Sequence, residues 1–330
     1  MIFVSEIDIC SGNLEGMPVN HSMKNPGVYY LFSCRVFAIL LLVFLMIPRT
    51  IWGQSRSDNY ISDRACPMGA VSESAEVSGG VNVLFCFIGG DLEEESGAAS
   101  EDIKEILQAE TPKNVHVYVM TGGCRRWEFS PELDNAVTYS RIDNGDLIIE
   151  HSEQQGSCTD TAALASWLKY IEEKNTANKN ILVFWGHGVK NPLGIGYDQL
   201  QDYDLSEEDD GFGVNNLPEI DYVQLQGDDI LQVSEIRDGI IESGMDVGII
   251  GFDACDMAGE DLYSALEGCC EWVIASEGNE DLRGWPQKQW LETVSSDLEQ
   301  TASRMEAAIN DDFLRRGREN SVTAKEVSIE

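Results

Sequence analysis

Two short strings that lie far apart in the sequence contain a thiol and an imidazole. They are residues 185–188 (WGHG) and residues 251–255 (GFDAC), and each follows a short apolar run. Each run is predicted to be a buried strand, so His187 and Cys255 both stand where a strand ends. Parallel neighbouring strands would bring both side chains to one edge of a sheet, where open α/β sheets place their sites. A thiol beside an imidazole is the minimum equipment for nucleophilic attack on a carbonyl carbon.

Around these strings the chain resembles the clostripain family of cysteine peptidases. Residues 184–188 (FWGHG) resemble its histidine motif, and residues 251–258 (GFDACDMA) resemble its cysteine motif. Residues 273–277 (VIASE) and 284–286 (GWP) are similar to the segment that follows in the family. Upstream, residues 89–93 (GGDLE) and 121–123 (TGG), with Trp127, fit the family's first strand–helix–strand unit.

The ordered match from about Val81 to Trp290 carries the resemblance, because each motif alone is short. It implies an α/β fold, namely a caspase-like three-layer α/β/α sandwich with a mostly parallel central sheet. It also implies a cysteine endopeptidase that cleaves peptide bonds after Arg, or after Lys, through a Cys–His dyad. Its partners would be peptide or protein substrates with a basic P1 residue.

In this interpretation Cys255 is the nucleophile and His187 is the general acid–base. A helix expected from Met257 would place Cys255 at a helix N-terminus, which lowers the pKa of a thiol. The N–H groups of Gly188 and Cys255 are candidate oxyanion donors, as the resemblance also implies. The alternatives are a small core cysteine and a capping or core histidine.

Acidic residues near the two motifs are candidates for binding the substrate. Asp253 stands two residues before Cys255 and would point to the same side of the strand. The resemblance implies that Asp253 helps to line a pocket for a basic P1 side chain through charge-assisted hydrogen bonds. The alternative is an aspartate bonded to a neighbouring loop. The family has a second acid after residue 276, and three candidates are available there: Glu277, Glu280 and Asp281.

Three positions depart from the family pattern. Asp256 follows the cysteine where an apolar residue is usual, and its charge would oppose thiolate formation if it faced the sulfur. Gly186 replaces a polar residue before the histidine, and Gln287 replaces an aromatic residue after Trp285. Asp256 and Gly186, together with the C-terminal truncation expected below, support a second hypothesis, a catalytically inactive relative that uses the same cleft as a surface binding protein.

Strands that alternate with helices predict a mostly parallel sheet that is covered on both faces. The expected strands are Val81–Phe87, Val115–Met120, Ile181–Trp185, Val247–Phe252 and Trp272–Ala275, with an antiparallel excursion within 134–149. The expected helices are Ser100–Ala109 with Ser100 as N-cap, one that contains Leu164–Ile171, Ser234–Ser243, Met257–Leu266 and Thr301–Arg315.

The formal net charge is −36, from 58 acidic and 22 basic residues in a chain of 330. This charge argues against nucleic acid and anionic membranes as partners, and it favours basic substrates and solubility. The 43% of hydrophobic residues suffice for a core.

Residues 1–53 are expected to be a leader, residues 54–80 a flexible linker, and residues 81–330 the peptidase domain. The apolar run Val36–Ile47 suits a signal peptide, and the alternative is an uncleaved anchor, which would be the chain's contact with a membrane. The protein is therefore expected to be secreted or on the cell surface. The family usually continues well beyond this length, so the domain is expected to be truncated at its C-terminus.

No cofactor or metal is expected in the chemistry. The chain contains nine cysteines, of which seven follow the leader, and an odd number favours at least one free thiol. Residues 198–229 hold eleven acidic residues and are predicted to be a long exposed loop, with calcium binding as the minor alternative. No Lys or Arg occurs between Asn191 and Ile236, so little self-cleavage is predicted in this loop.

Overall fold

The computed structural model describes residues 79–174, 176–198 and 230–327. Within these residues an eight-stranded sheet forms the centre of the domain. Its strands are β1 (Val81–Ile88), β2 (Val115–Gly122), β3 (Ala136–Asp143), β4 (Asp146–Gln154), β5 (Lys179–Trp185), β9 (Ile249–Asp253), β10 (Trp272–Ser276) and β11 (Val322–Glu326). A small second sheet contains β6 (Gly188–Lys190), β7 (Leu193–Ile195) and β8 (Leu231–Gln232).

The large sheet has the strand order β11-β10-β9-β5-β1-β2-β3-β4. The five strands in its middle, from β10 to β2, are parallel. Towards both edges the pairing is antiparallel: β11 pairs with β10, β3 pairs with β2, and β4 pairs with β3. The pair β3–β4 is the excursion expected from the sequence. The eight residues of β1 are all buried, because a central parallel strand is covered on both faces.

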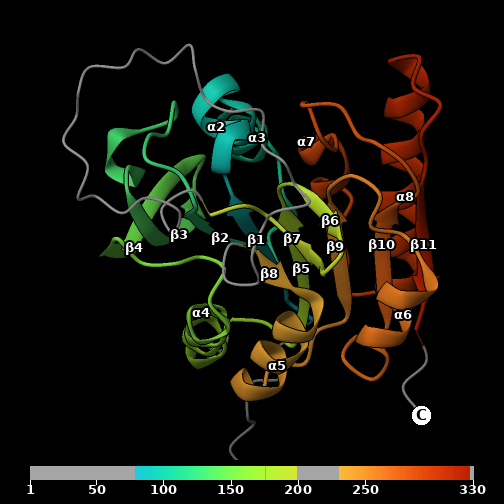
Figure 1. Cartoon of the computed structure of the whole chain (residues 1–330). Coiled ribbons are helices and arrows are strands. Elements are labelled where there is room, and N and C mark those ends of the chain that lie inside the picture. The colour runs from blue at the N-terminus through green and yellow to red at the C-terminus, as the bar shows by residue number, and fades with distance from the viewer. Residues whose placement is uncertain (1–78, 175, 199–229, 328–330) are drawn as a thin grey trace, which may run out of the picture. The chain divides into compact units, whose positions relative to one another are not determined.

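Helices cover both faces of the sheet, as Figure 1 shows. Apolar residues of α4 (Thr161–Lys174), α5 (Val233–Ser243) and α6 (Glu260–Leu266) pack in one core cluster. Residues of α3 (Ala98–Leu107), α7 (Gln287–Leu291) and α8 (Leu298–Arg315) pack in the other cluster. The short helix α2 (Gly90–Ser96) precedes α3 in the chain. The predicted α/β/α sandwich with a mostly parallel sheet is confirmed.

The first helical segment differs from the prediction, because two short helices follow β1. Gly97, in a left-handed conformation with φ 66°, ends α2 and caps α3, so Ser100 lies inside α3 instead of capping it. The buried Glu93 of α2 accepts hydrogen bonds from the N–H and the hydroxyl of Ser100. A buried carboxylate in α2 therefore holds the two helices together.

The helix after Cys255 begins later than the sequence indicates. The N–H of Asp256 donates to the carbonyl oxygen of Gly278 at 2.9 Å, and that of Ala258 donates to Ser276 at 2.8 Å. These bonds hold the backbone along the end of β10, so α6 begins only at Glu260. The expectation that Cys255 lies at a helix N-terminus is therefore wrong.

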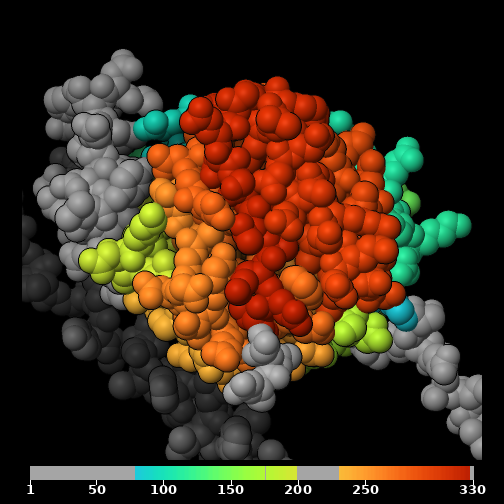
Figure 2. Space-filling view, turned by 90° about the vertical axis from the view of Figure 1, so that its right-hand side faces the viewer, coloured from blue at the N-terminus to red at the C-terminus, as the bar shows by residue number. Residues whose placement is uncertain are grey.

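The C-terminal part of the domain completes one side of the sheet. β11 pairs antiparallel with β10 at the edge, where the sequence shows only a polar segment. Figure 2 shows that the C-terminal segment, drawn in red and including α8, covers much of the face seen from that side. The loop between α8 and β11 reaches the site described below.

Several predictions fall outside the described residues: the leader at 1–53, nearly all of the linker at 54–80 and the acidic loop beyond Asp198. Among the helices in the described ranges, none has both the length and the apolar character to cross a membrane.

Candidate active site

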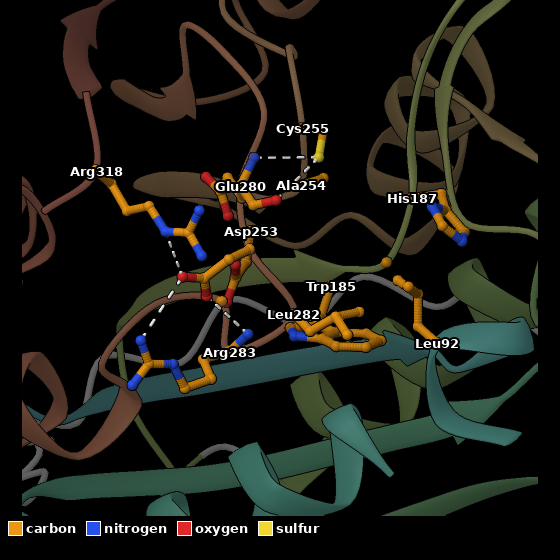
Figure 3. Close-up of a pocket in the computed structure, with 13 residues that line it drawn as sticks. Leu92, Trp185, His187, Asp253, Ala254, Cys255, Glu280, Leu282, Arg283 and Arg318 are labelled. Carbon is orange, nitrogen blue, oxygen red and sulfur yellow. Dashed lines mark hydrogen bonds and ion pairs between the residues drawn. The ribbon is translucent and has the colours of Figure 1, made fainter. Parts of the chain in front are cut away.

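His187 and Cys255 lie at one edge of the sheet, because the strands that lead to them are neighbours. Trp185 at the end of β5 pairs in register with Asp253 at the end of β9. The side chains of His187 and Cys255 line one open cavity of about 520 Å³, shown in Figure 3. The other lining residues are Leu92, Trp185, Gly186, Asp253, Ala254, Glu280, Asp281, Leu282, Arg283, Gly284 and Arg318.

The backbones that carry the two residues pack directly against each other. A methyl group at Gly188 would lie 1.9 Å from the carbonyl oxygen of Cys255 and 3.3 Å from its nitrogen. Glycine is therefore the residue that this contact permits at position 188. The two candidate oxyanion donors, the N–H groups of Gly188 and Cys255, belong to segments in contact at the cavity.

The thiol of Cys255 is half-buried beside the backbone of Glu280, whose N–H donates a hydrogen bond to Sγ at 3.2 Å. Burial raises the pKa of Cys255, and the negative charges of Asp256 and Asp253 raise it further. The hydrogen bond from Glu280 opposes this change without cancelling it. The direction is opposite to the lowered pKa that a helix N-terminus would give.

Replacing Asp256 by Asn is expected to make the thiol more reactive. Removal of this charge lowers the pKa of Cys255, so more thiolate is present at neutral pH and alkylation becomes faster. Asn also tolerates the left-handed backbone of this position, where φ is 57°. The measurement is the rate of iodoacetamide alkylation of the Cys255 peptide between pH 6 and 10. An unchanged profile would show that Asp256 does not act on the sulfur.

His187 has a carboxylate partner that the sequence interpretation missed. Its Nε2 lies 2.7 Å from Oδ1 of Asp91, and both side chains are largely buried. Asp91 belongs to α2, just after β1, and β1 is the other neighbour of β5 in the sheet. The GGDLE string marked this segment, but only the fold shows that Asp91 reaches the histidine.

Two carboxyl groups, those of Asp253 and Glu280, lie at the base of the cavity, and a third, that of Asp102, is buried next to Gly284. Asp253 accepts hydrogen bonds from the N–H of Trp285 at 3.1 Å and from Nε2 of Gln287 at 2.6 Å. Burial raises the pKa of Asp253 to about 6. Burial and the charge of Asp253 also raise the pKa of Glu280 and the pKa of Asp102. Of these two residues, Asp102 is the one that the sequence interpretation missed. A methyl group at Gly284 would approach Asp253 and Asp102 together, so their carboxyl groups converge there.

Asp281 lines the same cavity, but arginines already bind its carboxylate. Arg316 contacts it at 2.6 Å and Arg318 at 2.8 Å. Burial alone would raise the pKa of Asp281, yet the N–H of Arg283 and the nearby arginine charges lower it overall. Arg316 also donates to the carbonyl oxygen of Gly284 at 2.8 Å. These arginines fix the cavity wall, and Asp281 is not left as an unbalanced anion.

The remaining acidic candidate lies outside the cavity. Glu277 is exposed and accepts a hydrogen bond from the hydroxyl of Thr323 in β11 at 2.9 Å. Within the described ranges, no group of three or more His, Cys, Asp or Glu side chains is arranged to hold a metal ion. Calcium binding by the acidic loop beyond Asp198 stays a prediction outside these ranges.

Solved structures of C11 cysteine proteases, two of them described as secreted, share this fold. A protease from Bacteroides thetaiotaomicron, called iotapain, aligns with a TM-score of 0.52 and 12% identity over 76% of this chain and 66% of its own. A structure from the same organism with an irreversible peptide inhibitor gives 0.52 and 15%, over 72% and 60% of the two chains. An inactive zymogen of a C11 protease from Parabacteroides distasonis gives 0.52 and 17%, over 76% and 63%.

The chain therefore spans slightly less than two thirds of the length of these structures. A comparison with curated protein sequences finds no match. The model of the Clostripain family matches residues 87–330, which include Asp91, His187 and Cys255. With that match, and with the fold and the cavity that it covers, the chain belongs to the clostripain family of cysteine peptidases.

Proposed function

We propose that the protein is a cysteine endopeptidase that cleaves after Arg, and also after Lys, with Cys255 and His187 as its catalytic residues. Sγ of Cys255 attacks the carbonyl carbon and forms a thioester as the peptide C–N bond breaks. His187 takes the thiol proton and gives it to the leaving amine. Water then attacks the thioester, its proton passes through His187 to the sulfur, and the acid product leaves.

The observation that carries this proposal is the arrangement of one cavity. A thiol and an imidazole line it, and carboxyl groups lie at its base. Two of these, Asp253 and Glu280, are buried against each other, which makes a second negative charge unfavourable. A guanidinium or ammonium group would relieve that repulsion and accept both carboxylates as partners. The N–H groups of Gly188 and Cys255 are the proposed oxyanion donors.

A binding role in the same cleft is the second candidate. The raised pKa of Cys255 favours it, because a thiol that keeps its proton is a weak nucleophile. The description of one structural neighbour as an inactive zymogen is compatible with a silent resting state. We also propose secretion or surface exposure, since two neighbours are described as secreted and residues 36–47 suit a signal peptide.

A panel of fluorogenic peptides that differ only at P1 tests the proposed function. For Arg and Lys we expect kcat/KM about 10²-fold or more above that for Gln, Leu or Glu, because the buried carboxylates pair only with a cation. Iodoacetamide should abolish the hydrolysis. If folded protein binds Arg peptides without hydrolysing any member of the panel, the binding role replaces the enzymatic one.

A further inference from the structure

Three neighbouring parallel strands each deliver one side chain to the same edge of the sheet. β9 leads to Cys255, β5 leads to His187 and β1 leads to Asp91, and the order in the sheet is β9-β5-β1. His187 therefore stands between the thiol on one side and the carboxylate on the other. The contact between Asp91 Oδ1 and His187 Nε2 is 2.7 Å, which is the length of a charge-assisted hydrogen bond.

The chemistry of this contact fixes the position of a proton on the imidazole. An ionised carboxylate only accepts hydrogen bonds, so Nε2 must be the nitrogen that donates. In the neutral imidazole the other nitrogen, Nδ1, is then without a proton and is basic. The nitrogen that exchanges protons with the thiol and the substrate has to be the basic one.

We propose that Asp91 is a positioning residue, which holds His187 in the Nε2–H form and leaves Nδ1 as the nitrogen that performs acid–base catalysis. This inference rests on the proposed peptidase function. Nδ1 accepts the proton of Cys255 as sulfur attacks, and it donates that proton to the leaving amine. Asp91 accepts the hydrogen bond from Nε2 throughout and stabilises the imidazolium that exists between the two transfers.

The segment around Asp91 is built to hold its carboxylate in place. Glu93, two residues later in α2, is buried and accepts hydrogen bonds from Ser100 and from the N–H of Glu128 at 2.7 Å. Gly90 has φ 51°, and a methyl group there would lie 2.7 Å from the carbonyl oxygen of Tyr197. Because α2 is fixed at both points, Asp91 does not have to be ordered when substrate binds.

The first test compares Asp91→Asn with Glu95→Gln, an exposed residue of the same helix. Asn has the same shape, but its amide group can also donate to Nε2, so both tautomers become available. We expect kcat on an Arg peptide to fall about 10²-fold or more with KM nearly unchanged, since the tautomer serves the transition state and not binding. Glu95→Gln should change neither constant. If Asp91→Asn lowers kcat by less than about twofold, the proposal is overturned.

The second test needs no substrate and separates this inference from the proposed function. The ¹⁵N chemical shifts of the His187 ring report which nitrogen carries the proton, and His187→Gln assigns the signal among the four histidines. Wild type should show a protonated Nε2 and a bare Nδ1, and Asp91→Asn should show a mixture. A proton on Nδ1 in wild type would overturn the assignment. If wild type hydrolyses no basic peptide, the peptidase proposal fails while the shifts still decide the tautomer.

Discussion

Cys255→Ala is expected to reduce the hydrolysis of an Arg peptide by about 10⁴-fold or more, because it removes the atom that forms the thioester. Residual binding should survive, since the carboxyl groups at the cavity base do not depend on the sulfur. The measurement is kcat on the Arg peptide. Inhibition of the wild-type protein by an uncleaved analogue of the same peptide provides the reference for binding.

Cys269→Ala is the matched control for this variant. Cys269 is also half-buried and free, but it lies after α6 and does not line the cavity. It should retain nearly full activity and remain alkylated by iodoacetamide at Cys255. If Cys255→Ala keeps more than a small fraction of the wild-type rate, another group is the nucleophile.

Asp253→Asn is expected to lower kcat/KM for Arg peptides by about 10²- to 10³-fold, because a buried pairing charge is lost. The hydrogen bonds from Trp285 and Gln287 can still be accepted by the amide oxygen, so the fold should persist. Glu277→Gln is the control, since Glu277 lies outside the cavity and should leave the constants unchanged.

The pH dependence of this variant gives an independent check on Asp253. Since burial raises its pKa to about 6, wild-type enzyme should lose affinity for Arg peptides as the pH falls through that value. The carboxyl group becomes neutral there and no longer pairs with the guanidinium. KM should therefore rise towards low pH in wild type and much less in Asp253→Asn. Equal profiles in the two proteins would assign the recognition of the cation to another group.

The main strands could be predicted because their signal is local. Buried parallel strands consist of short apolar runs, and the strands that end at Trp185 and Asp253 lie within a few residues of the predicted ranges. Parallel neighbours necessarily end at one edge, so the meeting of His187 and Cys255 at one cavity also followed from the pattern.

The partners of these two residues could not be predicted, because they depend on contacts between distant segments. Asp91 reaches His187 only because β1 is the neighbour of β5. Asp102 was hidden by its place in an amphipathic helix, where an acid near the N-terminus is usually solvated. The partners of Asp281 also come from a distant segment, because Arg316 and Arg318 lie in the loop after α8.

The start of α6 shows a tertiary contact overriding a local preference. Residues from Met257 onward have a helical pattern, but the backbone of Asp256 and Ala258 bonds to the end of β10 instead. As a result, the N–H of Glu280 and not a helix terminus faces the sulfur of Cys255. A residue pattern reports the local helix preference and does not report the tertiary contact that overrides it.

Covalent labelling with an arginyl acyloxymethyl ketone tests most directly whether the thiol of Cys255, the imidazole of His187 and the carboxyl group of Asp253 form one site. Peptide mapping by mass spectrometry should find a single modification, on Cys255, which free Arg peptide slows and which the variants His187→Ala and Asp253→Asn both reduce strongly. Modification of Cys269 or of no residue in folded protein, or labelling of Cys255 at the wild-type rate in both variants, would contradict a shared site.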